Sequence, residues 1–540
     1  MNIFSYEDGV RIAEAMTNAK SGTCLRIPAG NYLFPPVGFL RRDYPISNTF
    51  YAPLRPISLL LEDKQDIELD FRGARLLFQG WTLPLVLDGC KNITVKNCTL
   101  DWIDPPAAEG TVLQADTDSV LIRIDPDDHR YQIRDKKLLF SAGGVDRPCW
   151  SLFEFDGTTG EARGDCSGNY EGAEWLDGPA HGTVRLQGRF TVPPRIGNRT
   201  VFRFGDRTQT GVFCTDCAAI RFENVTVHTA CGIGIVCQFC RDLAFDRVRM
   251  IPTADRIFST HDDGLQCVSC SGQIRLRDCA FRGTMDDCVN IHGTETVIDK
   301  IDGNVVYGRF AQACSAGFPN WATAGDMISF AERSTLNSVG RARIKSYALL
   351  DRFRFTITFS DPLPPELSDE CAMENLANTP EVDIRGCDFG SGRARGLLVS
   401  SPQAVMIAEN RFHTSGAAIL CSGDANYWFE SGACENVVIQ KNEFSAHCLS
   451  AAYEFCSGVI SLHPVIQEPE RSRGYHRNIA ITSNVFHYAG KPLLYALCAD
   501  GVNARENTVV CAEVPDMKHL WQSEYCKNVT IEGNITTVTR

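Results

Sequence analysis

Short segments in which apolar and polar residues alternate recur along most of the chain. An Asn, Asp, Gly or charged residue interrupts each segment near its middle, and the alternation then resumes. A period of two residues is typical of a β-strand with one buried face. Nine segments share the pattern: ITVKNCTL (93–100), IRFENVTV (220–227), LAFDRVRM (243–250), IRLRDCAF (274–281), VDIRGCDF (382–389), VMIAENRF (405–412), VVIQKNEF (437–444), IAITSNVF (479–486) and VNARENTVV (502–510).

The spacing of these repeats predicts the architecture. Equivalent positions lie 23 residues apart in three places: Asn224 to Arg247, Phe389 to Phe412, and Asn484 to Asn507. A repeat of about 20–25 residues with strands of period two and no helix pattern fits an all-β, right-handed parallel β-helix, in which each coil stacks on the last. A leucine-rich repeat would show its Leu and Asn/Cys consensus, and a propeller blade needs about 40 residues.

Two gaps between repeats are much longer than one coil. The gap from Asn97 to Asn224 spans 127 residues, and that from Asp278 to Gly386 spans 108. Both contain alternating segments separated by turn residues, which predict two inserted antiparallel β-barrels or sandwiches. We therefore expect five parts: first coils with a cap helix (1–103), a first β insertion (104–210), middle coils (211–293), a second β insertion (294–378) and C-terminal coils (379–540).

The start of the chain predicts the cap helix. Ser5 and Asp8 have the spacing of a capping box, and an amphipathic stretch containing Ile12 and Met16 follows. A helix there would cover the unpaired strand edges at the open end of the solenoid.

Composition narrows the partners. With 53 Lys+Arg and 66 Asp+Glu, the formal net charge is −13, which argues against a nucleic-acid partner. No apolar run reaches the roughly 18 residues that a membrane span needs, so we expect no membrane partner. Acidic residues stand where a secretion signal needs basic ones. We expect the chain as given to be cytoplasmic, unless a signal peptide has been removed, and its 24 cysteines to be thiols.

The main candidate for chemistry is a pair of acidic motifs, STHDDGLQC (259–267) and TMDDCVNIHG (284–293). Asp263 and Asp286 are 23 residues apart, the coil length found elsewhere. Residues one coil apart lie about 4.8 Å from each other, so these carboxylates should converge. Clustered carboxylates raise one another's pKa, which gives a glycosidase its acid and its bases. Adjacent Asp286 and Asp287 can share a site only if the backbone bends there.

Other polar residues are candidates for substrate binding. Asp262 belongs to the first acidic pair, and Asn290 and His292 alternate with Asp286 on the strand that follows. The segment GDANYWFESG (423–432) falls in a long gap between repeats, which predicts a projecting loop. In that loop Trp428 could stack on the apolar face of a sugar, with Asp424 and Glu430 binding hydroxyl groups. Arg395 is a further candidate ligand. For each of these residues a structural role is the alternative.

These motifs resemble known families. DDG followed one coil later by DDC is similar to the three-Asp site of the polygalacturonases, which are inverting β-helix glycosidases. The wider set, MDDCVNIHGT, GFPNW with GDMISF, RARGLLVSS and GDANYWFESG, resembles glycoside hydrolase family 110 over approximately residues 210–445. That resemblance implies an exo-acting, inverting α-1,3-galactosidase of blood-group-B-type or linear glycans. It also implies that Asp286 is the general acid, while Asp263 and Asp287 position and deprotonate a water. No cofactor is implied.

Three CxxC pairs raise the question of a metal: Cys214/Cys217, Cys237/Cys240 and Cys267/Cys270. Paired CxxC motifs are typical of thiolate zinc sites. However, Cys214 to Cys237 is again 23 residues, so stacked core thiols explain the spacing without a metal. We expect structural thiol ladders and no metal ligands, with zinc and redox sites as alternatives.

Two other functions fit the same fold. A polygalacturonase or a polysaccharide lyase would need basic residues for an anionic substrate, and the segment from Thr260 to Thr294 offers only Arg275, Arg277 and Arg282. A non-catalytic, glycan-binding β-helix has no need for two acidic pairs one coil apart. The sequence therefore favours a glycosidase acting on an oligosaccharide or glycoconjugate.

Overall fold

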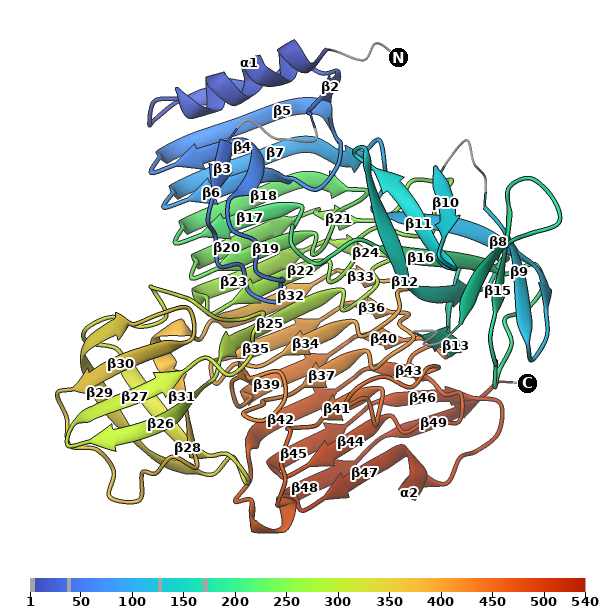
Figure 1. Cartoon of the computed structure of the whole chain (residues 1–540). Coiled ribbons are helices and arrows are strands. Elements are labelled where there is room, and N and C mark those ends of the chain that lie inside the picture. Colours follow the sequence, from blue (N-terminus) through green and yellow to red (C-terminus); the bar gives the residue numbers. More distant parts are fainter. Residues whose placement is uncertain (1–4, 36–39, 125–128, 169–172, 540) are drawn as a thin grey trace.

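The computed structural model describes residues 5–35, 40–124, 129–168 and 173–539. Its centre is a parallel β-helix that runs from the N-terminal to the C-terminal end, with one antiparallel insertion on either side (Figure 1). Helix α1 (Tyr6–Thr17) lies across the N-terminal end and buries Ile12, Ala13 and Met16 against the first coil. The Asp8 carboxylate accepts a hydrogen bond of 3.1 Å from the Ser5 backbone, as the capping box predicts.

One wall of the β-helix is a sheet that we call the site sheet, because it carries the residues discussed below. Its strands pair in parallel, and each contributes one wall of a coil. The strands are β4 (Arg55–Glu62), β6 (Leu83–Asp88), β17 (Val212–Thr215), β19 (Ile235–Gln238), β22 (Leu265–Val268), β25 (Val289–Thr294), β34 (Leu397–Val399), β37 (Ile419–Cys421), β41 (Ile460–Leu462), β44 (Leu494–Leu497) and β47 (Trp521–Glu524), with β3 (Leu40–Arg42) antiparallel at the first edge.

The second sheet turns a corner within each coil and contains the repeats read from the sequence. Its long first strands are β5 (Gln65–Phe78), β7 (Lys91–Trp102) and β18 (Ala218–Val227), with β1 (Cys24–Arg26) and β2 (Asn31–Leu33) paired to β5. Later coils split the strand in two: β20 (Arg241–Asp246) and β21 (Arg249–Met250), β23 (Ser271–Arg277) and β24 (Ala280–Phe281), β32 (Glu381–Arg385) and β33 (Asp388–Phe389), β35 (Val405–Ala408) and β36 (Arg411–Phe412), β39 (Glu435–Gln440) and β40 (Glu443–Phe444), β42 (His476–Thr482) and β43 (Val485–His487), β45 (Ala499–Arg505) and β46 (Thr508–Cys511), β48 (Lys527–Glu532) and β49 (Ile535–Val538).

Identical side chains stack from coil to coil because the register is conserved. Phe389, Phe412, Phe444 and Phe486 form a continuous stack with ring centroids 4.6–5.0 Å apart. At the corner, a residue with positive φ precedes a buried Asn in each of five successive coils, the first φ being 61° at Glu409. These Asn side chains form a ladder, in which each amide donates to the next and to a backbone carbonyl: Asn410, Asn442, Asn484, Asn507 and Asn534.

The first insertion is one curved antiparallel sheet. It contains β8 (Ala107–Ala115), β9 (Ser119–Arg123), β10 (Tyr131–Arg134), β11 (Lys137–Ala142), β12 (Val145–Phe155), β13 (Ala162–Gly168), β14 (Glu174–Asp177), β15 (Thr183–Gln187) and β16 (Arg199–Phe204). The second insertion is a closed barrel of β26 (Thr296–Asp302), β27 (Val305–Arg309), β28 (Met327–Glu332), β29 (Ser338–Leu349), β30 (Arg354–Phe359) and β31 (Cys371–Asn375). The expected fold class, a parallel β-helix with two antiparallel β insertions, is confirmed.

Few other elements are present in the described residues. Strand β38 (Glu430–Ser431) pairs with the end of β25, the short helix α2 (Met517–Leu520) precedes the last coil, and two 3₁₀ turns cover Leu376–Asn378 and Pro469–Arg471. Among the described helices none has the length and apolar character to cross a bilayer.

The CxxC cysteines stack as thiols inside the coils. Cys214 pairs in register with Cys237, and Cys237 with Cys267, so the first cysteines of the three motifs form one column. All described cysteines are unpaired thiols. Among the residues that the structure describes, the cysteines form no group of three ligand atoms within 4.8 Å of one another. The thiols therefore act here as small buried apolar groups.

Removal of one Asn from the ladder should destabilise the protein. Asn484→Ala deprives the Asn442 backbone amide and side chain of their acceptor, and the Asn507 side chain of its donor. Buried polar groups left unpaired cost about 1–3 kcal/mol each, so we expect a lower thermal midpoint than in wild type. Asn503→Ala, on the half-exposed face of β45, is the control and should leave the midpoint nearly unchanged. Equal midpoints for both variants would contradict a stabilising role of the ladder.

Candidate active site

The two acidic motifs meet on the site sheet, but in a register one residue away from the expected one. Strand β22 pairs with β25 so that Leu265 lies beside Val289, a spacing of 24 residues. Asp263 therefore precedes its strand by the same two residues as Asp287, and the Gly264 amide donates to the Asp287 carbonyl at 2.9 Å. The expectation that Asp263 stacks on Asp286 was wrong, because this coil is one residue longer than its neighbours.

Asp263, Asp286 and Asp287 nevertheless converge. Each offers a carboxylate oxygen, and these oxygens lie within 4.8 Å of one another. The chain bends at Met285, Asp286 and Cys288 before β25 begins, so adjacent Asp286 and Asp287 can both reach the cluster. This is the backbone bend that a shared site requires.

The members of this carboxylate cluster differ in environment. Asp287 is fully buried and accepts a hydrogen bond of 2.7 Å from Nε of Arg395. Burial raises the pKa of Asp287 to about 6, against the lowering effect of Arg395 and with a further contribution from the negative charge of Asp286. Burial, with the charges of Asp286 and Asp287, raises the pKa of Asp263 well above its ordinary value. The cluster therefore retains a proton at a pH where isolated carboxyl groups are ionised.

Asp286 is the most accessible of the three. Its Oδ1 accepts a hydrogen bond of 2.6 Å from the hydroxyl of Tyr453, which comes from the loop between β40 and β41. Burial and the charge of Asp286 raise the pKa of Tyr453, so this hydroxyl remains a donor. The bond fixes the orientation of the Asp286 carboxyl group.

Asp262 points away from the cluster, into a buried ion pair. Its Oδ1 lies 2.6 Å from Arg203 and 3.2 Å from Arg207, both at the end of the first insertion. Burial opposes ionisation, but the charges of Arg207 and Arg203 outweigh it and hold the pKa of Asp262 below its ordinary value. The expectation that Asp262 binds substrate is therefore corrected: it anchors two arginines, and one of them, Arg207, lines the pocket with Asp263.

The loop before β38 bends around the Asp424 carboxylate. Oδ1 accepts from the backbone amides of Asn426 and Tyr427 at 2.6 and 2.8 Å, and Oδ2 accepts from the amide of Trp428. The indole nitrogen of Trp428 donates to Glu454 at 2.9 Å, which fixes the ring. Asp424 thus shapes the loop and also borders the pocket, with Trp428 beside it.

Glu430, Asn290 and His292 form a polar group on the outer face of β25 and β38. Glu430 accepts a hydrogen bond of 2.9 Å from Asn48, which belongs to the loop between β3 and β4. Asn290 and Glu430 line the pocket, whereas His292 does not. His292 is buried behind Glu430, with Nε2 3.5 Å from its carboxylate and Nδ1 2.7 Å from the Gly293 carbonyl. The structure therefore places His292 as a support for Glu430 and not as a ligand.

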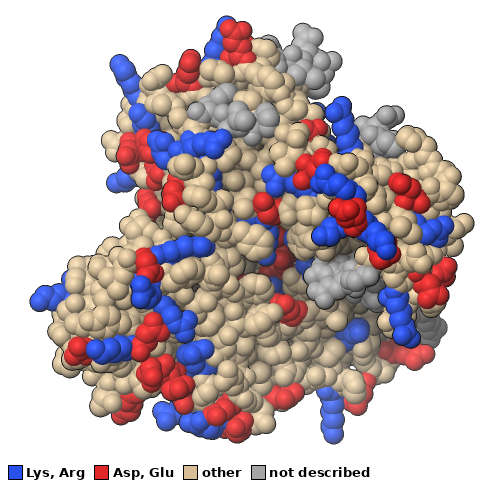
Figure 2. Space-filling model, viewed as in Figure 1, with Lys and Arg blue, Asp and Glu red and all other residues tan. Residues whose placement is uncertain are grey.

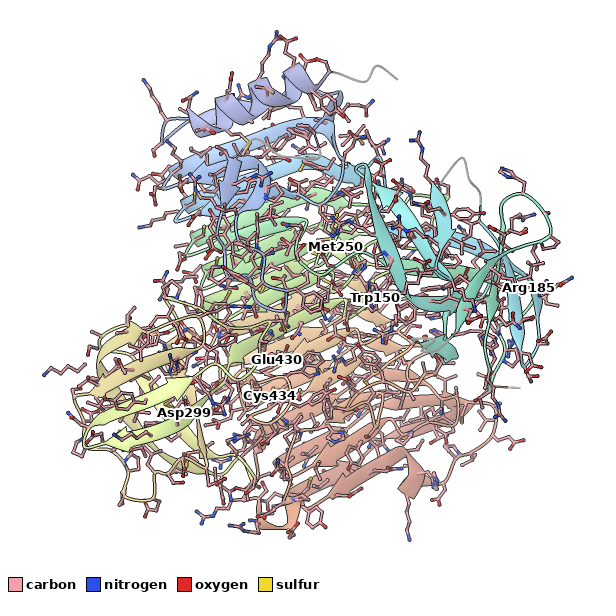
Figure 3. All side chains as sticks on the ribbon, viewed as in Figure 1. Trp150, Arg185, Met250, Asp299, Glu430 and Cys434 are labelled. Atoms are coloured by element: carbon pink, nitrogen blue, oxygen red, sulfur yellow. The ribbon has the colours of Figure 1, made fainter. Side chains whose placement is uncertain are left out.

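Two adjoining pockets open on this face. The inner pocket, of about 570 Å³, contains the whole carboxylate cluster together with Arg395, Asp424, Trp428 and Glu430. The outer pocket, of about 1070 Å³, lies against the first insertion and includes Trp150, Phe153 and Arg393. Of the three clustered Asp residues, only Asp286 lines both pockets. Figure 2 shows acidic and basic side chains in the hollow between the insertions, and Figure 3 shows Glu430 on the β-helix and Trp150 at the edge of the first insertion.

Several site residues escaped sequence reasoning. Asn48, Arg207, Tyr453 and Glu454 line the inner pocket but lie in segments outside the repeat pattern. No spacing connects them to the Asp motifs, because loops of unrelated length bring them there. The sequence offered no signal for these four residues beyond their chemical types.

The carboxylate cluster also has the composition of a cation site, since three carboxylate oxygens suit hard divalent ions. Arg395 and Arg207 already supply positive charge to it, the first through the 2.7 Å bond to Asp287 and the second through Asp262. These guanidinium groups perform part of the charge compensation that a cation would supply.

Comparison with known proteins places the chain among glycosidases. Residues 108–199 match the family model described as GLAA-B beta-barrel domain I. Alpha-1,3-galactosidase B of Bacteroides thetaiotaomicron is 35% identical, over 95% of this chain and 85% of the relative. Alpha-1,3-galactosidase A of Bacteroides fragilis is 30% identical, over 98% and 90%. A family 28 exopolygalacturonase of Yersinia enterocolitica has a similar structure, with a TM-score of 0.44 and 11% identity over 97% of this chain and 76% of that one.

The different environments of Asp262 and Asp263 predict opposite effects on stability. Asp262→Asn leaves Arg203 buried with a weaker partner, and breaking such a pair costs about 3–5 kcal/mol. Asp263→Asn removes a charge that burial and two neighbouring carboxylates disfavour. We expect the thermal midpoint at pH 7 to fall in the first variant and to stay equal or rise in the second. The reverse order would mean that the two residues have been assigned the wrong environments.

Proposed function

The chain belongs to the α-1,3-galactosidase family, and we propose that it hydrolyses terminal α-1,3-linked galactose from oligosaccharides by an inverting, exo-acting mechanism. The observation that carries this proposal is the position of Asp286 at the junction of the two pockets. A glycosidic oxygen must lie where the terminal sugar meets the rest of the glycan. The inner pocket would then hold the galactose and the outer pocket the remainder.

The charge of the inner pocket supports a neutral sugar. Six acidic residues line it and only two arginines: Asp263, Asp286, Asp287, Asp424, Glu430 and Glu454, against Arg207 and Arg395. Asp287 already neutralises Arg395, and Asp262 neutralises Arg207. A uronic acid would bring a further negative charge into this pocket and would be repelled. The pocket therefore favours galactose over the substrate of a polygalacturonase.

In the proposed reaction Asp286 is the general acid. Its proton passes to the glycosidic oxygen as the bond to the anomeric carbon breaks, and the aglycone leaves with that proton through the outer pocket. Asp263 and Asp287 hold a water molecule and accept its proton as the water oxygen attacks the anomeric carbon. Trp428 borders both pockets with its ring held by Glu454, so it would stack on the sugar next to the cleaved bond.

The arrangement of three carboxylates supports inversion. Their oxygens lie within 4.8 Å, closer than the roughly 6.5–9.5 Å usual for an inverting pair. A retaining enzyme, however, needs one nucleophile and one acid, which leaves the third carboxylate without a role. Arg395 neutralises Asp287 and thereby weakens it as a nucleophile, whereas a water held by two carboxylates needs no strong nucleophile of its own.

A glycan panel with product identification tests the substrate. We expect release of galactose from linear Galα1,3Gal and from the fucosylated blood-group-B trisaccharide, because the larger outer pocket has room for a branch. Lactose and polygalacturonic acid should remain intact. Cleavage of polygalacturonic acid would support the lyase or polygalacturonase alternative, and binding without cleavage would support a glycan-binding module.

Substitution of the three carboxylates should abolish turnover while the fold survives. Asp263→Asn, Asp286→Asn and Asp287→Asn should each lower kcat about 10²-fold or more, as loss of a general acid or base does. Asp299→Asn, on the surface of the second insertion, is the control and should retain wild-type activity. A folded variant of the cluster that keeps more than about a third of wild-type turnover would remove that residue from its proposed role.

The ion pair between Arg395 and Asp287 predicts a shift in the pH profile. Arg395 lowers the pKa of Asp287, so Arg395→Gln should raise that pKa further above its value of about 6. A carboxylate that must be ionised to accept a proton then loses activity at higher pH. We expect the acidic limb of kcat/KM to move upward by roughly one pH unit or more. Arg393→Gln, which alters an arginine not paired with Asp287, should leave that limb in place even if KM changes.

The stereochemistry of the first product tests the water mechanism. Attack by water on the face opposite the leaving group converts an α-galactoside into β-galactose. Proton NMR spectra collected in the first minutes of hydrolysis should show the β anomer before mutarotation produces the α anomer. Initial release of α-galactose would instead identify one Asp as a covalent nucleophile.

A further inference from the structure

A second group of metal-ligating side chains lies where the first insertion touches the β-helix. Glu161 stands at the tip of the hairpin between β12 and β13, while His413 and His447 follow β36 and β40 in consecutive coils. Each offers one ligand atom, and the three atoms lie within 4.8 Å of one another. Nε2 of His413 is 2.8 Å from Oε1 of Glu161, and Nδ1 of His447 is 3.7 Å from Oε2.

These separations suit a small tetrahedral ion. Zinc binds imidazole and carboxylate at about 2.0–2.1 Å, so two ligand atoms in a tetrahedral shell lie about 3.3 Å apart. The two observed separations, 2.8 and 3.7 Å, bracket that value. Movements of less than an ångström would therefore complete the geometry.

The surrounding contacts orient the three ligands. Nδ1 of His413 lies 2.8 Å from Oγ of Ser445, which leaves Nε2 directed at Glu161 and matches the outer-shell support typical of metal-bound histidine. The rings of His413 and His447 stack at 4.7 Å. Nε2 of His447 is buried without a hydrogen-bond partner, so the protein supplies no competing use for that ring.

The hairpin that carries Glu161 is itself fixed. The Asp156 side chain accepts from the amides of Thr158 and Thr159, and the Gly160 carbonyl accepts from Ser391 on the β-helix at 2.8 Å. The third ligand is therefore held in place by backbone contacts. Such preorganisation lowers the cost of assembling a binding site.

We propose that Glu161, His413 and His447 bind one divalent transition-metal ion of the zinc type, with solvent as the fourth ligand. Two imidazoles favour such an ion over Mg²⁺ or Ca²⁺. The side chains are 33%, 39% and 12% exposed, which leaves room for water on one side. Ala162 and Arg163 follow Glu161 directly and line the outer pocket, so the ion fastens that wall to the coils. The expectation of no metal ligands did not foresee this site, because 252 residues separate Glu161 from His413.

Cobalt titration of the metal-free, tag-free full chain tests the proposal. Co²⁺ should bind with a stoichiometry of one and produce the visible d–d bands of a four-coordinate site, and Zn²⁺ should displace it. Binding by the cysteines would instead add an intense near-ultraviolet thiolate band. Zn²⁺ should also raise the thermal midpoint, because a ligand that binds only the folded chain stabilises it.

Variants locate the ion. His413→Ala and His447→Ala should each lose the cobalt bands, and Glu161→Gln provides a milder change if either fails to fold. His487→Ala is the matched control: His487 is also 39% exposed and pairs with a carboxylate, Glu443, but lacks a second histidine. Unchanged cobalt binding in the histidine variants, or none in wild type, would overturn the proposal.

The same titration separates this site from the carboxylate cluster. Asp286→Asn should bind cobalt as wild type does, and EDTA should leave turnover of an aryl α-galactoside unchanged. Loss of cobalt binding in Asp286→Asn would place the ion in the active site and overturn the proposal. The cobalt bands require no substrate, so they report on this site even if the proposed galactosidase activity is absent.

Discussion

The parallel stacking of coils constrains everything else in this molecule. Hydrogen bonds between neighbouring parallel strands hold successive coils about 4.8 Å apart, so a residue type repeated once per coil contacts its own copies. Stacked rings such as Phe412 on Phe444, and the amide ladder from Asn410 to Asn534, follow from that rise. An Asn at the corner satisfies buried backbone carbonyls that the bend leaves without a strand partner.

The same stacking brings negative charges together at the site, and the protein compensates them with arginines from elsewhere. Three carboxylates within 4.8 Å of one another would repel strongly if all were ionised. Arg395, one coil beyond Asp287, neutralises one of them, and Asp262 holds Arg203 and Arg207 beside the others. The result is a cluster whose members differ in proton affinity, which is the condition for one fold to supply both an acid and a base.

The insertions turn a repetitive surface into a specific one. A bare β-helix presents similar coils along its length, whereas the pockets occur only where Trp150 and Phe153 of the first insertion face the coils. The loop from Asp424 to Glu430 and the segment around Asn48 close the inner pocket from other directions. Substrate selection therefore depends on segments that interrupt the repeat, while the repeat supplies the rigid base that holds the carboxylates.

How much the sequence determined by itself follows from the range of each interaction. Strand period, coil length, the thiol columns and the convergence of the Asp motifs depend on contacts between successive coils, which a spacing of 23 residues already encodes. The exact register at the site does not, because one added residue in the coil moved Asp263 from Asp286 to Asp287. Tertiary structure alone decided that Asp262 pairs with arginines, that His292 supports Glu430, and that Tyr453 and Asn48 reach the pocket. Those contacts join segments through loops and insertions of irregular length, so no period in the chain could reveal them.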